Sequence, residues 1–280
     1  MNKSLVVVLL FTIFFNSCSS LGKKTLKNEL TQPEELFSYS DKSGKFVVKI
    51  YSGFNKKDKA FFYKKSIEIP DKTENNVLEQ SITFSDVGTV GRKQTIVRPK
   101  LSQYTVWFEG KKYFSELRMN PAKRSIDVKM VSPEVDMNGS KSVKLPSTKV
   151  QYCFFSQIIE CARAMGFISK ANSKESGSMN FYVVWEGYPF LNEVYTGVPV
   201  ELFSKAQLEY DGKLKENEIR YNLKVAGQSI FYILDHSQKM KKMFWVSQGI
   251  SMVSESYKKS TQEKTKKNQP QAPEDGDEIE

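Results

Sequence analysis

The chain is poor in the residues that most often carry enzymatic and metal chemistry. Its 280 residues include one histidine, His236, and three cysteines. A zinc or iron site built from His and Cys needs several such ligands at a characteristic spacing, which this sequence lacks. Asp235, His236 and Ser237 are adjacent, so they cannot take up the facing geometry of a catalytic triad. We therefore expect no metal, no cofactor and no catalysis.

Arginine is also scarce. The net charge is +10, but only six of the 42 cationic residues are arginines, and the lysines are interleaved with acidic residues along the chain. Nucleic-acid recognition relies strongly on the planar guanidinium fork, whereas interleaved charges are typical of a solvated surface. The composition predicts no nucleic-acid partner.

Long apolar runs are absent except at the start. Leu5 to Phe15 is uncharged and follows Lys3. This run is shorter than the roughly 20 residues that span a bilayer as a helix, and it has the length of a signal-peptide core. The sequence therefore predicts export, with residues 1–17 as a cleaved signal peptide.

The residues after the run, FFNSCSS, resemble the lipobox of bacterial lipoproteins. In that class a small residue, here Ser17, precedes the cleaved bond, and the cysteine, here Cys18, becomes the lipidated N-terminus. The resemblance implies anchoring to a membrane of the cell envelope through several acyl chains, which hold a protein stably. Ser19 in place of aspartate implies the outer membrane.

Two polar segments flank the candidate domain. Residues 18–45 are rich in Ser, Lys, Gln and Glu, which predicts a lipidated N-terminus followed by a flexible tether. Residues 257–280 run from a cationic to an acidic stretch and are predicted to be disordered. The domain itself is expected over residues 46–256.

Within this domain the apolar residues recur with period two. In residues 217–225, Ile219, Tyr221, Leu223 and Val225 share one face. This alternation is typical of a half-buried antiparallel strand. The fold class is therefore mainly β (α+β), with one large curved antiparallel sheet. The same reading predicts strands at residues 45–51, 65–69, 80–87, 93–98, 102–108, 112–119, 124–131, 179–185, 206–212, 229–235 and 242–247.

One short central helix is predicted from Ser156, as its N-cap, to Met165, before Gly166. Polar stretches around it predict a sub-boundary near 133–178. The sequence also suggests two related β halves, because Tyr104, Val106, Trp107, Glu109, Gly110 and Tyr113 recur as Tyr182, Val184, Trp185, Glu186, Gly187 and Phe190. The repetitive composition of aromatic hairpins explains this match more simply than duplication does.

Cys153 and Cys161 are the pair that remains if Cys18 carries lipid. Export permits a disulfide. Eight residues of continuous helix rise about 12 Å, whereas a bridge needs Cα atoms within about 7 Å. An extended segment at Cys153 followed by a helix would bring the two together, so the sequence favours a bridge, with two free thiols as the alternative.

Aromatic residues are concentrated in two stretches, VWFEGKKYF and VVWEGYPF. They hold more large apolar side chains than two hairpins need, which suggests a ligand pocket. A curved sheet on a lipid-anchored envelope protein is similar to bacterial lipoprotein carriers and receptors, and this resemblance implies a hydrophobic or lipid-like ligand. The alternatives are a structural or adhesive lipoprotein with an envelope protein partner, and an envelope hydrolase that uses carboxylates. The candidate ligand-binding residues are Trp107, Phe108, Tyr113, Phe114, Trp185, Tyr188, Phe190 and Trp245.

Overall fold

In the computed structural model of the chain, the described residues are 35–41, 46–55, 60–69, 77–90, 94–148, 150–193, 195, 197, 201–214 and 217–254. The predicted signal peptide, Cys18, the predicted tail at 257–280 and most of the predicted tether lie outside these residues. The described strands belong to one compact unit, Glu34–Glu280, so the expected sub-boundary near 133–178 does not divide the fold.

The described residues form one mainly antiparallel sheet of fifteen strands. Its strand order is β8-β7-β6-β5-β4-β3-β2-β1-β15-β14-β13-β12-β11-β10-β9, and only the β9–β10 pair among these is parallel. This confirms the predicted fold class. The strands are β1 (Glu35–Asp41), β2 (Val47–Asn55), β3 (Ala60–Glu68), β4 (Val77–Val90), β5 (Gln94–Phe108), β6 (Lys111–Asn120), β7 (Ser125–Val131), β8 (Gly139–Lys144), β9 (Tyr152–Phe154), β10 (Ser178–Val184), β11 (Phe203–Lys213), β12 (Ile219–Val225), β13 (Gln228–Leu234), β14 (Met240–Trp245) and β15 (Ile250–Ser254).

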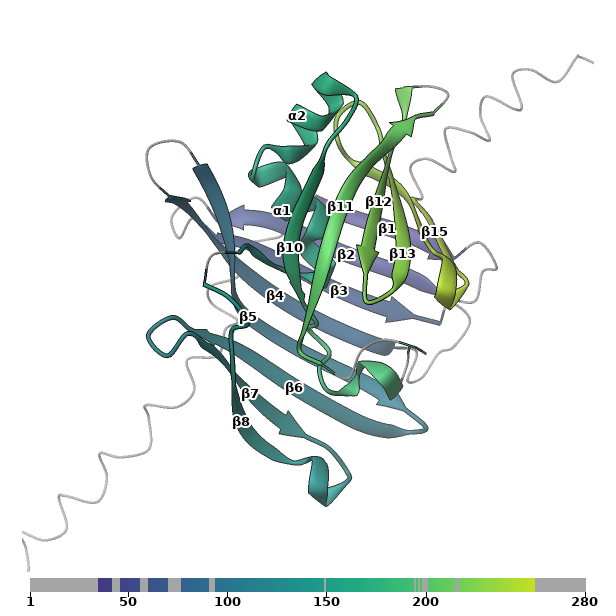
Figure 1. The fold of residues 1–280 in the computed structure, drawn as a ribbon. Helices are drawn as coiled ribbons and strands as arrows, with labels where there is room; N and C mark the ends of the chain where they lie inside the picture. Colours follow the sequence, from purple (N-terminus) through teal and green to yellow (C-terminus); the bar gives the residue numbers. More distant parts are fainter. Residues whose placement is uncertain are drawn as a thin grey trace, which may run out of the picture. The chain divides into compact units, whose positions relative to one another are not determined.

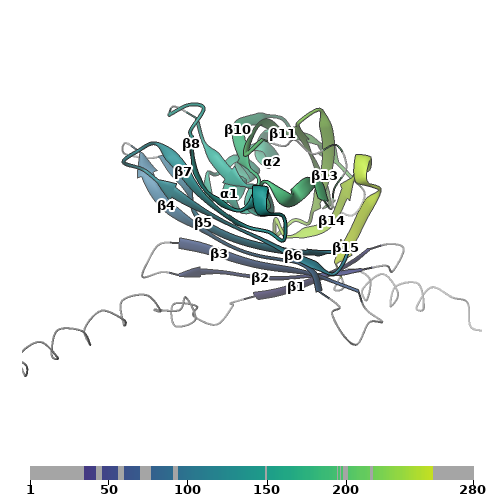
Figure 2. The same cartoon turned by 90° about the horizontal axis from the view of Figure 1, so that it is seen from below.

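The sheet is strongly curved. Strands β1 to β8 form a broad arch, and the strands from β10 to β15 curl over its concave side (Figures 1 and 2). Strand β9 and the helix that follows it lie against β5. The concave side therefore has a second layer over it, made by the later part of the same sheet.

Strand β12 shows why the sequence predicted this fold. Its buried residues are Ile219, Tyr221, Leu223 and Val225, and Lys224 between them is exposed. Successive side chains of a strand point to opposite faces, so one face enters the core and the other meets solvent.

The predicted strands 93–98 and 102–108 are one long strand, β5. The register across β4 shifts between Phe84 and Ser85, which pair with Leu101 and Pro99. A bulge of this kind accommodates proline, which has no N–H to donate to the ladder. Strand β5 therefore continues through Pro99.

The predicted helix is present but differs at both ends. A 3₁₀ turn, η3 (Phe155–Gln157), leads into α1 (Ile158–Ala164), and Gly166, with φ of 74°, follows it. The expected N-cap was wrong, since Ser156 hydrogen-bonds to Glu186 instead. A second helix, α2 (Phe167–Lys174), comes after Gly166 and was not predicted.

The predicted tether was wrong for its last part, because Glu35–Asp41 is strand β1. This strand pairs with both β2 and β15. Tyr39 is buried at 2 % exposure, and its hydroxyl donates a hydrogen bond to the Met240 carbonyl at 3.3 Å. Burial of this ring outweighs the polar composition around it, so the sheet begins earlier than expected.

Candidate functional site

A cavity of about 740 Å³ lies between the first four strands, the η3–α1 segment and the last three strands. The walls therefore come from the two ends of the described chain and from its middle. Most of the lining side chains are apolar, and they are Tyr39, Phe46, Val48, Phe61, Phe62, Tyr63, Ile67, Leu78, Phe155, Ile158, Ile159, Tyr195, Tyr232, Met240, Met243, Trp245, Ile250 and Met252.

Aromatic rings form one side of this cavity. The Phe155 ring lies between two indoles, with centroids 4.7 Å from Trp185 and 5.2 Å from Trp245. Tyr195 stacks on Trp245 at 5.2 Å with an interplanar angle of 23°. Contacts between offset and tilted rings of this kind are favourable beyond the burial of their area, so they hold the wall in place.

Glu79 is a charged group on the cavity wall. It is 1 % exposed, it forms an ion pair with Lys65, and its Oε2 accepts a hydrogen bond of 2.8 Å from the Tyr195 hydroxyl. Burial and the adjacent Glu79 charge raise the pKa of Tyr195 well above its ordinary value, so this hydroxyl remains a donor. A buried carboxylate needs such partners to offset its lost hydration.

Glu186 lies behind the cavity wall and is also satisfied. The backbone N–H and the hydroxyl of Ser156 both donate to its Oε1, at 2.7 and 2.5 Å. Burial raises the pKa of this carboxyl, while the Ser156 hydrogen bonds and the Lys65 charge oppose the rise. Glu186 thus fixes the start of the η3 turn, which carries Phe155 into the cavity.

Glu160 and Arg163 line the cavity from one face of α1. The Arg163 guanidinium donates to the Gln238 carbonyl in the β13–β14 turn, at 2.5 Å. Apart from a hydrogen bond with its own backbone, the Glu160 carboxyl has no hydrogen bond or ion pair among the described residues. Burial raises the pKa of Glu160, and the nearby Arg163 charge opposes this.

The predicted ligand-binding residues are distributed over several places. Trp245 lines the cavity. Trp185 and Phe190 are 1 % and 0 % exposed and belong to the core, and the Trp185 indole donates to the Ser204 hydroxyl at 2.9 Å. Tyr188 lines a second hollow of about 900 Å³ and lies beside Lys141, whose Nζ is 4.7 Å from the ring centroid.

The other four predicted residues lie on the β5–β6 hairpin and do not line the cavity. Phe108 is exposed, and Phe114 is half-buried. Trp107 is half-buried with the Lys112 ammonium 5.9 Å from its ring centroid. Tyr113 is buried. The prediction of these four as lining residues was wrong for this cavity, because the hairpin lies away from it.

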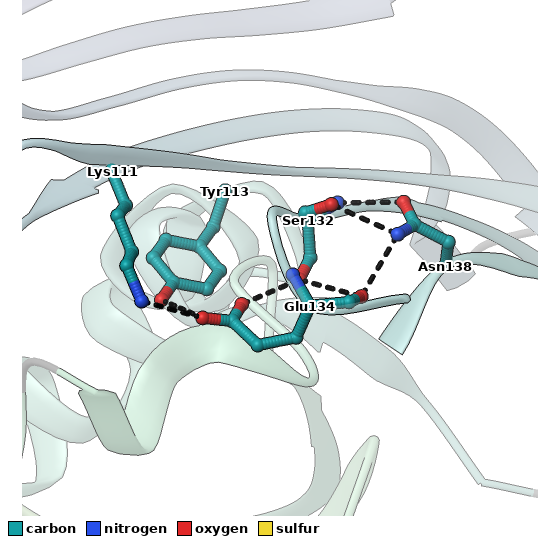
Figure 3. Close-up of polar contacts among 5 residues, drawn as sticks. All are labelled: Lys111, Tyr113, Ser132, Glu134 and Asn138. Carbon is teal, nitrogen blue, oxygen red and sulfur yellow. Dashed lines mark hydrogen bonds and ion pairs between the residues drawn. The ribbon is translucent and has the colours of Figure 1, made fainter. Parts of the chain in front are cut away.

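Tyr113 instead joins a polar cluster with Lys111, Ser132, Glu134 and Asn138 (Figure 3). Glu134 Oε1 accepts hydrogen bonds from Tyr113 at 3.0 Å and Lys111 at 3.1 Å, and its Oε2 accepts one from Ser132 at 2.7 Å. Hydrogen bonds, with Ser132 the largest contributor, lower the pKa of Glu134 to about 2. These contacts tie residues 132–138, between β7 and β8, to strand β6.

Cys153 on β9 and Cys161 on α1 are both free and fully buried. Burial raises the pKa of the Cys161 thiol well above its ordinary value, and contact with the Cys153 thiol adds to the rise. The extended segment and helix thus bring the cysteines together as expected. They are not joined by the bridge that the sequence favoured.

Sequence reasoning missed the charged residues of the cavity, Lys65, Glu79, Glu160, Arg163 and Lys239. Strand β4 shows why. Its buried positions are Glu79, Ser81, Thr83 and Ser85, whereas Ile82 and Phe84 between them are half-buried. The alternation was visible, but apolar burial predicts the opposite orientation. The signal in the sequence that could have indicated a polar buried face was a carboxylate, Glu79, at an alternating position of this strand.

Within the described ranges, no group of three or more His, Cys, Asp or Glu side chains lies close enough to hold a metal ion. Among the same residues, no helix has both the length and the apolar content to cross a bilayer.

No known protein family and no curated protein matches this chain. One solved structure that resembles it is a beta-barrel-like protein of the domain of unknown function DUF1849 from Brucella abortus. The similarity covers 78% of this chain and 92% of that chain, at 11% identity and a TM-score of 0.38. A likeness at this TM-score carries no inference about function.

Proposed function

We propose that the protein is a lipoprotein of the cell envelope, anchored to the outer membrane through Cys18, whose curved sheet binds a hydrophobic or lipid-like ligand without catalysing a reaction. The observation that carries the binding function is the cavity of about 740 Å³. Ligand pockets of proteins typically measure about 300 to 1,000 Å³ and combine apolar walls with a few polar groups. This cavity has both properties.

The source of affinity would be desolvation of the ligand. Each methylene that leaves water for an apolar surface contributes about 0.8 kcal/mol. The rings of Phe155, Tyr195 and Trp245 and the side chains of Met243 and Met252 supply such a surface. Catalysis by carboxylates would need two acids that act together, and of the two acids that line the cavity, Glu79 and Glu160, Glu79 is already engaged by Lys65 and Tyr195.

Analysis of the bound ligand tests this proposal. The full-length protein, extracted from envelopes, is expected to release lipid or another apolar small molecule into organic solvent, and native mass spectrometry should show the same mass bound. Recovery of a stoichiometric protein partner without small molecule would instead favour the interaction lipoprotein.

Cavity-filling variants connect the ligand to this site. Met243→Trp and Ile250→Trp both place an indole at lining positions and should reduce bound ligand by about tenfold or more, since filled volume is lost to the ligand. Val131→Trp, at a position 47 % exposed and away from the cavity, is the matched control. Equal ligand in all three folded variants would contradict the assignment.

The anchor is tested separately. Incorporation of radioactive fatty acid into the wild-type protein, and none into Cys18→Ala, is expected from the lipobox. Separation of inner and outer membranes on a density gradient then locates the labelled protein. Equal labelling of the two proteins would contradict the proposed lipid anchor at Cys18 and would not affect the proposal that the cavity binds a ligand.

A further inference from the structure

Two acidic residues, Glu79 and Glu160, line the cavity, and a third, Glu186, lies behind its wall. Glu79 has the Lys65 ammonium and the Tyr195 hydroxyl, and Glu186 has two donors from Ser156. Apart from its own backbone, Glu160 has no hydrogen-bonding or ion-pairing partner among the described residues. Of these carboxyls, Glu160 is the one whose acceptor capacity is not used by another residue.

The surroundings of Glu160 are largely apolar, and Glu160 itself is half-buried. Ile158 and Ile159 precede it on α1 and line the same cavity. The phenols of Tyr63 and Tyr232 lie close by, since burial, with a smaller contribution from the Glu160 charge, raises their pKa values. A carboxylate that loses part of its hydration gains from a partner that donates hydrogen bonds.

The neighbouring cation does not supply the missing partner. Arg163 lies three residues further along α1, but its guanidinium donates to the Gln238 carbonyl. Lys65 is engaged by Glu79, and Lys239, which also lines the cavity, is not among the charges that act on Glu160. A further donor to Glu160 is therefore expected from water or from a ligand in the cavity.

We propose that Glu160 binds the head group of the ligand, and that the ligand is an amphiphile whose head donates hydrogen bonds, as an ammonium, amide or hydroxyl group does. This inference rests on the proposed function, because it assigns the polar contact of the same cavity. The apolar chain lies against the aromatic wall, and the head lies at α1. A bare carboxylate head offers no donor and is repelled by the Glu160 charge.

Binding of three amphiphiles with the same dodecyl chain length tests this inference. The full-length protein is stripped of ligand and transferred to amphipol, and calorimetry measures its affinity for dodecylammonium, dodecanoylglycerol and dodecanoate. At neutral pH, dodecylammonium should bind most tightly and dodecanoate least tightly. Glu160→Gln should weaken dodecylammonium by about tenfold or more, as expected for a charge-assisted hydrogen bond, and should not weaken dodecanoate.

Glu209→Gln is the matched control. Glu209 lies on β11, pairs with Lys224 and does not line the cavity. This variant should bind all three amphiphiles as the wild type does. The same tenfold loss in Glu209→Gln would show that the effect of Glu160→Gln comes from net charge rather than from contact with the head group.

Thermal stability without ligand separates recognition from a structural role. Because no other described residue hydrogen-bonds or ion-pairs with Glu160, Glu160→Gln should melt at the wild-type temperature or above it. A lowered melting temperature, or an equal loss of dodecylammonium binding in Arg163→Gln, would assign Glu160 to the protein's own contacts and overturn the inference. If the wild type binds none of the three amphiphiles, the proposed function itself fails; equal affinities in wild type and Glu160→Gln overturn the inference alone.

Discussion

Residues 104–116 and 182–193 have the same order of aromatic, valine and Glu-Gly residues, yet they form different structures. In the first segment, Glu109 and Gly110 have φ of 49° and 75° and form the turn of the β5–β6 hairpin. In the second, β10 ends at Val184, and Glu186 and Gly187 are buried in an irregular segment that leads to the 3₁₀ turn η4 (Phe190–Glu193).

The two segments differ because one packs on the other. A Cβ on Gly187 would lie 2.8 Å from Cζ of Tyr104, so glycine permits the close approach. The rings of Tyr113 and Phe190 also meet, with centroids 5.3 Å apart. The first segment forms its hairpin within the sheet, whereas the second takes its shape from the surface that it covers. Similar local patterns therefore give different structures when their tertiary contacts differ.

The two tryptophans at equivalent positions should show the largest difference. Trp185→Ala leaves a large cavity in the core and should reduce the free energy of unfolding by about 3–5 kcal/mol. Trp107→Ala, on the half-buried hairpin position, should cost about 1 kcal/mol. Urea unfolding followed by far-UV circular dichroism measures both, and equal costs would contradict the difference in burial.

The two glycines should differ by a smaller amount. Gly187→Ala forces a methyl group against Tyr104 and Leu191 and should destabilise by about 1–3 kcal/mol. Gly110→Ala has no atom within 4 Å of the new methyl group and meets only the strain of positive φ, about 1 kcal/mol. Thermal melts compare the two. A larger loss for Gly110→Ala would mean that the packing contact is not what fixes the second segment.

The smallest expected effect concerns pH. Tyr113 of the hairpin donates to Glu134, whereas its counterpart Phe190 has no hydroxyl. Folding lowers the pKa of Glu134 from 4.5 to about 2. The ionised Glu134 carboxylate therefore stabilises the folded state fully above pH 4.5, and this stabilisation is lost as the pH falls from 4.5 to about 2.

Glu134→Gln should therefore be less stable than the wild type near neutral pH, and the difference should vanish near the lower pKa value. Urea unfolding at several pH values measures this change. Phe190→Leu, which alters the second segment and no acid, should differ from the wild type by an amount independent of pH. A constant difference for Glu134→Gln would contradict the lowered pKa.

Most of the sheet could be predicted from alternation. Strands such as β12 have apolar residues on the buried face, so pattern and structure agree. Strand β4 reverses this rule, because its buried positions include the small polar residues Ser81, Thr83 and Ser85, and Ser85 donates to Gln157 of the η3 turn. The local sequence of β4 gives no sign of this contact, since β4 and the η3 turn are distant along the chain.

The cavity was expected, but its lining was largely misplaced. The concentration of aromatic residues in two stretches predicted a lining made by the β5–β6 hairpin and Trp185. The walls of the cavity come mainly from β1–β4 and β13–β15 instead. Those strands become neighbours through the pairing of β1 with β15, which joins the two ends of the described chain. Such non-local pairing is set by the whole sheet and leaves no local signal.

Strand β1 also joins the first and the last parts of the cavity wall. It pairs with β2 from Glu35↔Ser52 to Ser40↔Val47 and, within the described residues, with β15 from Tyr39↔Ser254 to Asp41↔Met252. Tyr39 and Met252, on either side of this seam, both line the cavity. A change that displaces β1 would therefore disturb both walls at once, so the strand that begins the domain also sets the shape of its interior.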